Sequence, residues 1–333
     1  MRVDKMMEIK RFSTSEELIN TIIASGAFTA IKIIGVTGSI GRGEKELSDT
    51  QLNDVDFFVV ADEADVTVKK ELDLTLQEMT GTIFTDVLYI STDRFKKYIH
   101  CKTIPQFIFD IFRGSLILYI DQDFYPDILK SQDNEYSIIY DSAVAVLYTR
   151  IWCLTGPYQV HNGNICPLDD EEFTFRQMKK AITAIIDAIL ICEGIYNSPK
   201  WSDKLQQITG SGYYEKHKDE LDTILELHNN ICSENFTFAH QNLIRQYINA
   251  INYIRSTQER YLEYCIKYNI IYPLLSREQR RINKATKKQY QTLQLIQELY
   301  NPKTHSKDSE RQKKVIEKLS ILYRENYLEV MNE

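Results

Sequence analysis

The sequence predicts a protein of the α+β class, in which a small mixed β-sheet flanked by helices is followed by an all-helical bundle. Two observations support this division. Short β-branched runs alternate with helical periodicity in about the first 120 residues, whereas only helical periodicity follows from about residue 138. We place the boundary within Gln122–Ser137, which gives an N-terminal domain of residues 1–125 and a C-terminal domain of residues 138–333.

Strands are expected where apolar, β-branched residues cluster between polar turns. These runs are Ala30–Val36, Val55–Val60, Ile83–Ile90 and Ser115–Ile120. Helices are expected where apolar residues recur three and four positions apart, at Thr14–Ala24, Val68–Met79 and Thr92–Phe112. In the C-terminal half the same periodicity predicts helices at Ser142–Leu154, Glu171–Ile195, Leu221–Cys232 and Leu243–Tyr268.

The composition is that of a globular protein with room for two cores. Of 333 residues, 43% are hydrophobic and 26% are charged, which excludes a disordered chain. The net charge of −7 means that the surface as a whole repels nucleic acid. No run of about 18 apolar residues is present, so we expect no membrane span.

Cellular location is inferred from the cysteines and from the N-terminus. The six cysteines are scattered without a CxxC pair, which indicates reduced, mostly buried thiols rather than a zinc site or a disulfide framework. The N-terminal residues carry charges but no apolar core of a signal peptide. We therefore expect a cytoplasmic protein.

Gly38 and Ser39 open a glycine-rich turn directly after the first predicted strand. A turn with little side-chain bulk lets backbone N–H groups point at a phosphate, and the hydroxyl of Ser39 adds another donor. A Gly-Ser pair alone is common, so the turn gains weight only together with the acidic residues that follow it.

Asp54 and Asp56 open the second predicted strand, and Asp86 lies within the third. Residues two apart in a strand share a face, so Asp54 and Asp56 point the same way while Val55 points into the core. Carboxylates on one face repel each other unless a hard cation lies between them, and Mg²⁺ prefers such oxygen ligands. If the neighbouring strand places Asp86 across from them, the cluster can hold a second ion for in-line displacement at phosphorus.

Each of these aspartates could also have no role in metal binding. An Asp-x-Asp pair at the start of a strand is more often solvated than metal-bound. Asp86 is harder to dismiss, because burying a lone carboxylate among Ile83, Phe84, Val87 and Leu88 would be costly without a partner or a metal. The order of the three features on consecutive strands favours a functional site.

The stretch TGSIGRGEKELSDTQLNDVDFFVV, residues 37–60, resembles the signature of the polymerase-beta-type nucleotidyltransferase superfamily, in which Gly-Ser is followed by Asp-apolar-Asp and a later third carboxylate. The resemblance implies that Asp54, Asp56 and Asp86 are catalytic and bind two Mg²⁺ ions. It implies that Gly38, Ser39 and Arg42 bind the triphosphate of a nucleoside triphosphate.

The chain departs from the family pattern in the loop that precedes Asp54. The spacer after Ser39 is longer than usual, and EKELSDTQL, residues 44–52, looks like an insertion. Ser48-Asp49 could be aligned instead, but Thr50 and Gln51 do not continue as an apolar strand. Asn53-Asp54-Val55-Asp56 does continue as one, so we retain Asp54.

Within that superfamily the chain resembles small antibiotic and minimal nucleotidyltransferases. The segments on which this resemblance rests are FIFDIFRGSLILYID, residues 107–121, and ITAIIDAILICEGIYNSPKWSDKL, residues 182–205. This implies that a nucleoside monophosphate is transferred to a hydroxyl of a small molecule, such as an aminoglycoside-like antibiotic, with release of pyrophosphate. The helical half would then select the acceptor.

Several alternatives remain open at this point. The acceptor could be a protein hydroxyl or a tRNA end, the enzyme could synthesise an oligonucleotide second messenger, or the chain could be a catalytically inactive nucleotide-binding module. A homodimer is an additional expectation on general grounds. None of these is distinguished by the shared core motif.

Residues outside the motif are weaker candidates. Acceptor contacts in the helical half are expected among Tyr148, Arg150, Arg176, Lys179, Lys180, Tyr196 and Lys200, although a solvated helix face is the commoner role. A basic stretch with Arg277, Arg280, Arg281, Lys284, Lys287 and Lys288 could touch RNA, but we favour charged helices facing water. His100, His161 and His240 stand alone and are expected at the surface or in polar contacts.

Overall fold

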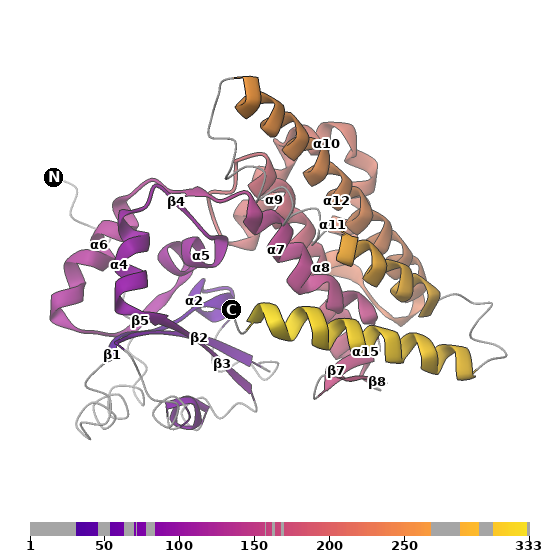
Figure 1. The fold of residues 1–333 in the computed structure, drawn as a ribbon, viewed down its shortest axis with the longest axis horizontal. Helices are drawn as coiled ribbons and strands as arrows, with labels where there is room; N and C mark the ends of the chain where they lie inside the picture. Colours follow the sequence, from indigo (N-terminus) through magenta and orange to yellow (C-terminus); the bar gives the residue numbers. More distant parts are fainter. Residues whose placement is uncertain are drawn as a thin grey trace. The chain divides into compact units, whose positions relative to one another are not determined.

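The computed structural model describes residues 31–45, 54–62, 70, 72–77, 84–156, 158–161, 164–167, 170–267, 287–299 and 309–331. The chain divides into two compact units (Figure 1). The first comprises residues 1–138 with residues 197–203, and the second comprises residues 139–196 with residues 204–333. The helix expected at Thr14–Ala24 lies outside the described residues.

The first unit alternates strands and short helices along the chain. Its elements are β1 (Ile31–Val36), α2 (Gly38–Gly41), β2 (Asp54–Ala61), β3 (Phe84–Ser91), α4 (Thr92–His100), β4 (Thr103–Ile104), α5 (Gln106–Gly114), β5 (Leu116–Ile120), α6 (Tyr125–Asp133) and β6 (Ser137–Ile138). Residues 72–77 form a further helical turn. The four strands expected from the β-branched runs are therefore confirmed.

The main sheet has the strand order β3-β2-β1-β5. β2 pairs with β3 in parallel, whereas β1 pairs antiparallel with both β2 and β5, so the predicted mixed sheet is confirmed. Helices α4, α5 and α6 lie on one side of this sheet, and the helical residues 72–77 lie on the other (Figure 1). The predicted α+β class is confirmed as well.

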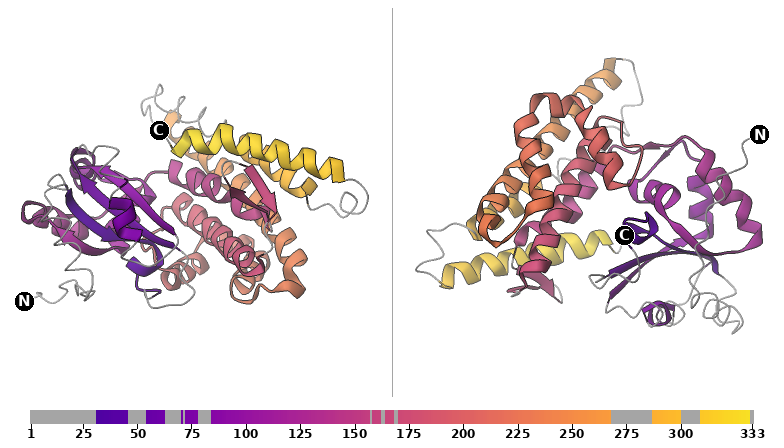
Figure 2. Two further views of the ribbon diagram at one scale, coloured as in Figure 1. Left: turned by 90° about the horizontal axis from the view of Figure 1, so that it is seen from below. Right: turned by 180° about the vertical axis from the view of Figure 1, so that it is seen from behind.

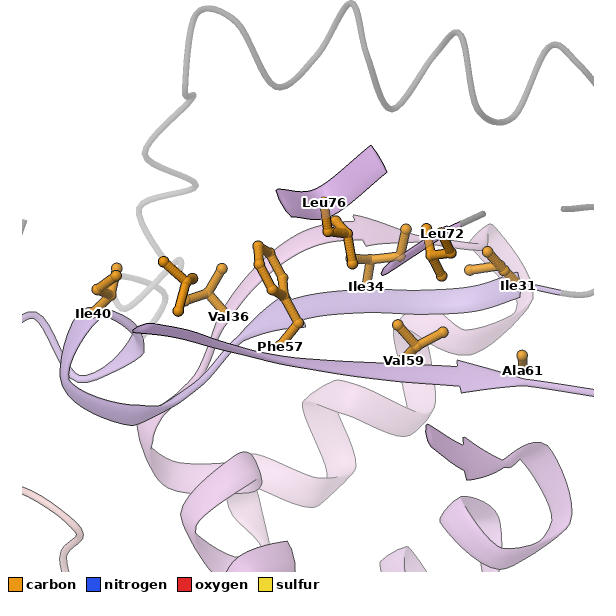
Figure 3. Close-up of a cluster of buried hydrophobic side chains, with 10 residues drawn as sticks. Ile31, Ile34, Val36, Ile40, Phe57, Val59, Ala61, Leu72 and Leu76 are labelled. Atoms are coloured by element: carbon orange, nitrogen blue, oxygen red, sulfur yellow. The ribbon is translucent and has the colours of Figure 1, made fainter. Parts of the chain in front are cut away.

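The side of the sheet that faces residues 72–77 carries an apolar cluster (Figure 3). Phe57 and Val59 alternate along β2 on this side, and Leu72 and Leu76 pack against them. All four side chains are buried, and each contributes about 1.5–3 kcal/mol by leaving water. Ile40 of α2 belongs to the same cluster and anchors the short helix to the sheet.

The single helix expected at Thr92–Phe112 was wrong. Two helices, α4 and α5, occupy this range, and the two-residue strand β4 lies between them. Pro105 explains the break, because proline disfavours helical backbone at the preceding residue and Ile104 is accordingly in a strand. The carbonyl of Pro105 then accepts from the N–H groups of Ile108 and Phe109 at the start of α5.

The second unit is built mainly of helices. Its elements are α7 (Asp141–Arg150), β7 (Tyr158–His161), β8 (Asn164–Pro167), α8 (Glu171–Cys192), α10 (Gly212–Lys216), α11 (Lys218–Asn230), α12 (Phe236–Lys267), the helical residues 287–299 and α15 (Ser309–Met331). Helix α9 (Trp201–Thr209) begins with residues 201–203 of the first unit and continues in the second. Helices α7, α8 and α12 lie side by side (Figures 1 and 2). Residues 184–192 of α8 are buried all round, which makes this segment the centre of the bundle.

The C-terminal half is not all-helical, contrary to the prediction. β7 and β8 form an antiparallel hairpin between α7 and α8, and α15 packs against β8. The hydroxyl of Tyr158 on β7 accepts a hydrogen bond of 2.6 Å from Gln312 Nε2 on α15. The strands are four residues each, too short to produce an alternation that stands out from helical periodicity. Among the described helices, none combines the length and apolar character that a membrane span requires.

Candidate active site

Asp56 and Asp86 are register partners in the parallel ladder of β2 and β3. Neighbouring strands lie about 4.8 Å apart, and partners in a ladder project to the same side of the sheet. Asp54, two residues before Asp56, projects to that side as well. The side is opposite to the apolar cluster, so the three carboxylates share one face near the beginning of both strands.

The two faces of β2 and β3 are fixed by packing. Phe58 follows Asp56 on the carboxylate face and is fully buried, and its ring lies beneath Gly35 of β1. A Cβ added at Gly35 would come within 2.2 Å of the Phe58 ring, so the close pairing needs glycine there. On the opposite face, the Tyr89 hydroxyl donates to Asp73 Oδ1 over 2.9 Å, and burial followed by this bond raises the pKa of Tyr89.

Gly38 and Asp56 are in direct contact. Gly38 has a φ of +65°, a conformation that glycine adopts without strain. A Cβ added at Gly38 would lie 2.1 Å from Asp56 Oδ2, so the Asp56 carboxylate is directed against the backbone of the turn. The N–H of Thr37 also donates to the Asp56 carbonyl over 2.8 Å. Turn and carboxylate are therefore held together from two sides.

Ser39 lies within a turn that is closed by its own backbone bonds. The Ser39 carbonyl accepts from the N–H groups of Glu44, at 2.8 Å, and Lys45, at 3.2 Å. Gly41 lies so close to the Val36 carbonyl that an added Cβ would approach the oxygen to 2.3 Å. The half-buried Ser39 therefore directly follows Gly38, the residue that contacts Asp56. The first N–H groups of a helical turn have no partner within that turn.

Arg42 forms an ion pair with Glu44. Its Nε and Nη2 donate to Glu44 Oε2 over 3.0 and 2.8 Å, and the two side chains keep 22% and 27% exposure. Glu44 Oε1 in turn accepts from the backbone N–H of Trp201 over 2.8 Å. The sequence-based role of Arg42 at a triphosphate stays a prediction, and its observed partner is Glu44.

The predicted residues are thus gathered, but not as a preassembled metal site. Asp54 and Asp86 are exposed and Asp56 is half-buried, so the expected cost of burying Asp86 does not arise. Within the part of the chain that the structure describes, no three Asp, Glu, His or Cys side chains converge closely enough to hold a metal ion by themselves. The three carboxylates lie on one face of the sheet, and Asp56 and Asp86 are in register, but the side chains do not enclose a metal site.

The acceptor candidates in the second half differ widely in exposure. Tyr148 and Tyr196 are buried, Lys179 and Lys180 are half-buried, and Arg150 and Lys200 are exposed. Arg176 pairs with Glu172 one helical turn away, which is a solvated helix pair. Lys287 is exposed and Lys288 is half-buried, whereas Arg277, Arg280, Arg281 and Lys284 lie outside the described residues.

The histidines and cysteines have structural positions. His100 is exposed beside Lys130, and His240 is buried with its Nε2 2.7 Å from the Leu154 carbonyl, a polar contact of the expected kind. Cys101, Cys153, Cys192 and Cys232 are free thiols, of which Cys153 and Cys192 are buried. The side chain of His161 lies outside the described residues.

Sequence reasoning missed Glu44 and the segment of residues 197–203. Glu44 stands at the start of the stretch interpreted as a loop insertion, and segment 197–203 stands in a stretch assigned to the helical domain. Their contact joins residues 157 positions apart, a separation over which periodicity carries no signal. The polar character of Glu44 within a glycine-rich turn was the one available hint.

Comparisons with known proteins add no relative. The sequence matches no model of a known protein family, and a comparison with curated proteins gave no significant match.

Proposed function

We propose that the protein is a magnesium-dependent nucleotidyltransferase, which transfers a nucleoside monophosphate from a nucleoside triphosphate to an acceptor hydroxyl and releases pyrophosphate. The observation that carries this proposal is the register of Asp56 with Asp86, with the Gly38 backbone against the Asp56 carboxylate. The sequence motif and the placement of its parts are consistent with each other, and this agreement supports the proposal.

The donor set fits Mg²⁺. Asp54, Asp56 and Asp86 offer only carboxylate oxygens, on one face of the sheet, and Mg²⁺ is commonly held by one or two carboxylates together with substrate phosphates. A site that needs the substrate to complete it does not require three converging protein ligands. When bound, the ion supplies charge neutralisation for the phosphates.

The chain's own groups bind and orient the substrate. Ser39 and the backbone N–H groups of its turn hold the triphosphate, and Arg42 adds positive charge beside the turn. The acceptor oxygen forms a bond to the α-phosphorus, and the bond from that phosphorus to the pyrophosphate oxygen breaks. Asp86 takes the proton from the acceptor hydroxyl. Positioning and electrostatics supply most of the rate gain in such transfers.

The acceptor in this proposal is a small cationic molecule that carries a hydroxyl, such as an aminoglycoside-like antibiotic. The net charge of −7 supports a cationic acceptor over RNA, since the protein's own field attracts cations and repels a polyanion.

The test is incubation with each α-phosphate-labelled nucleoside triphosphate and Mg²⁺, with and without a panel of acceptors. Pyrophosphate release and the mass of the product are measured, and the double substitution Asp54→Asn, Asp56→Asn and an EDTA arm serve as controls. Release that needs an acceptor, both carboxylates and the metal supports the transferase. Release without an acceptor indicates oligonucleotide synthesis, and absence of nucleotide binding would remove the enzyme proposal.

A further inference from the structure

The carboxylate of Glu44 connects two parts of the first unit that are distant in sequence. Its Oε2 accepts from two nitrogens of Arg42, and its Oε1 accepts from the N–H of Trp201 over 2.8 Å. The Glu44 side chain therefore accepts hydrogen bonds from the Arg42 guanidinium, on the 38–45 turn, and from the first backbone N–H of α9. Each of these bonds has an ionised acceptor, and such hydrogen bonds are stronger than bonds between two neutral groups.

Packing at Gly114 reinforces the same junction. A Cβ added at Gly114 would lie 2.8 Å from Pro199 Cγ and 2.9 Å from Arg42 Cγ. The stem of Arg42 and the ring of Pro199 therefore both rest on the Gly114 backbone. The position of the Arg42 stem is defined by this apolar contact, and that of its guanidinium by Glu44.

Segment 197–203 is ordered by bonds of its own. The Ser198 hydroxyl donates to Asp203 Oδ2 over 2.6 Å, and this bond lowers the pKa of the Asp203 carboxyl. The bond links Ser198 to the first turn of α9, the helix whose first N–H binds Glu44. The segment can therefore act as a fixed support for the turn.

The turn supported in this way is the one that contacts Asp56. The Glu44 N–H bonds to the Ser39 carbonyl, and Gly38 lies against the Asp56 carboxylate. We infer that Glu44 is a positioning residue: by joining Arg42 to the backbone of Trp201, it holds the 38–45 turn in the geometry that binds the triphosphate. This inference rests on the proposed function, because it assigns a role to Glu44 within that same site.

The first experiment measures the affinity of the full chain for each of the four nucleoside triphosphates with Mg²⁺, by titration calorimetry. Glu44→Ala removes both contacts and is expected to weaken binding at least tenfold. Glu44→Gln keeps an oxygen for the Trp201 N–H but loses the charge opposite Arg42, so a smaller loss is expected. Glu172→Gln, which breaks the exposed pair with Arg176, is the matched control and should bind as the wild type does.

The second experiment isolates the backbone bond. Trp201 is the first residue of α9, a position where proline is well tolerated, so Trp201→Pro removes the N–H while it suits the start of the helix. Trp201→Ala removes the indole but keeps the N–H. We expect triphosphate binding at least threefold weaker in Trp201→Pro than in Trp201→Ala. Circular dichroism and thermal melts confirm that both variants are folded.

A spectroscopic signature separates positioning from a general loss of stability. Trp152 and Trp201 are the two tryptophans, so Trp152→Phe leaves Trp201 as the single emitter. Addition of the bound nucleotide with Mg²⁺ should change the Trp201 emission in this background. The change should disappear when Glu44→Ala is added, at nucleotide concentrations that still saturate the site.

The outcomes separate the two proposals. If the wild type binds a triphosphate and Glu44→Ala and Trp201→Pro bind it equally well, the role of Glu44 is refuted while the transferase proposal stands. If the wild type binds none of the four nucleotides, the transferase proposal fails and the inference fails with it. Weaker binding in both variants, with an unchanged Glu172→Gln control, supports the inference.

Discussion

Asp86 lies directly opposite Asp56 across the parallel ladder of β2 and β3, and both side chains face the same side of the sheet. Like charges in direct cross-strand opposition destabilise a sheet. Asp54 is the one other charged residue in these two strands, and it is also a carboxylate. A cation held between the two carboxylates would remove this repulsion.

Asp56→Asn and Asp86→Asn should each abolish nucleotidyl transfer, with a loss of at least about a thousandfold, because each removes a negatively charged oxygen ligand of the metal ion. Both variants should fold, since a neutral amide relieves the repulsion. Turnover is measured by pyrophosphate release and stability by thermal unfolding without metal, in which the melting temperature should stay equal or rise.

Asp73→Asn is the matched control for these two variants. Asp73 lies on the other side of the sheet, where it accepts from the Tyr89 hydroxyl, and an Asn side chain retains an accepting oxygen. It should transfer nucleotide at close to the wild-type rate. Wild-type turnover in Asp56→Asn would refute the assignment of the active site.

Gly38→Ala and Gly43→Ala form a second matched pair. Both glycines have φ near +65–70°, so either substitution should lower the free energy of unfolding by about 1 kcal/mol through backbone strain. Only Gly38 has a neighbour: an added Cβ would meet Asp56 Oδ2 at 2.1 Å, whereas nothing lies within 4 Å of the one at Gly43. Gly38→Ala should therefore also displace the Asp56 carboxylate.

The expected difference appears in activity more than in stability. Gly38→Ala should lose at least about a hundredfold in turnover, because small displacements of a reacting group are costly. Gly43→Ala should lose less turnover than Gly38→Ala, because nothing lies within 4 Å of the Cβ that it adds. Denaturant unfolding and pyrophosphate release are measured on both variants, and equal activities would show that contact with Gly38 does not position Asp56.

Much of the sheet could be predicted because each strand combines β-branched residues with polar ends. Asp54 and Asp56 could be assigned to one face from the two-residue period alone. The register of Asp86 with Asp56 could not, since the pairing of two strands separated along the chain is not encoded in the local pattern of either strand. Pro105 indicates the break between α4 and α5, but the helical periodicity on both sides of it favoured a single helix.

The contact between Glu44 and Trp201 lies beyond any local pattern. Nothing in the spacing of residues indicates that segment 197–203 packs in the first unit, because the chain passes through α7 and α8 before reaching it. The β7–β8 hairpin was missed for a different reason, its four-residue strands. Local signals predicted elements, whereas long-range packing decided which of them meet.

The Lys204–Asp187 pair predicts a large loss of stability when it is broken. Lys204 Nζ lies 2.7 Å from Asp187 Oδ1, both side chains are about 95% buried, and the ammonium also lies over the Tyr196 ring. Lys204→Met leaves a buried carboxylate without its cation, and Asp187→Asn leaves a buried ammonium without its anion. Each should lower the free energy of unfolding by roughly 3–5 kcal/mol.

Denaturant unfolding checks this, with Glu172→Gln as the control for an exposed pair. The Arg176–Glu172 pair is solvated, so its loss should cost less than about 0.5 kcal/mol. The double variant Lys204→Met, Asp187→Asn should be more stable than the sum of the two single losses predicts, because it leaves no unpaired buried charge. If each single substitution lowered the free energy of unfolding by less than 1 kcal/mol, water would have to reach the Lys204–Asp187 pair.

His240 predicts how stability depends on pH. Burial lowers the pKa of His240 to about 4, and the bond to the Leu154 carbonyl offsets this effect only in part. The pKa in the unfolded chain is about 6.5, so between these values the unfolded state binds a proton that the folded state does not. Stability is therefore fully present above about pH 6.5 and falls with decreasing pH, by up to roughly 3 kcal/mol near pH 4.

His240→Gln tests whether His240 causes the loss of stability at low pH, because the Gln side chain can still donate to the Leu154 carbonyl but does not titrate. Denaturant unfolding between pH 4 and 7 should show a shallower loss in this variant than in the wild type. Part of the slope should remain, since burial also lowers the pKa of His228. A wild-type slope in His240→Gln would mean that His240 is already protonated, or reached by water, in the folded state.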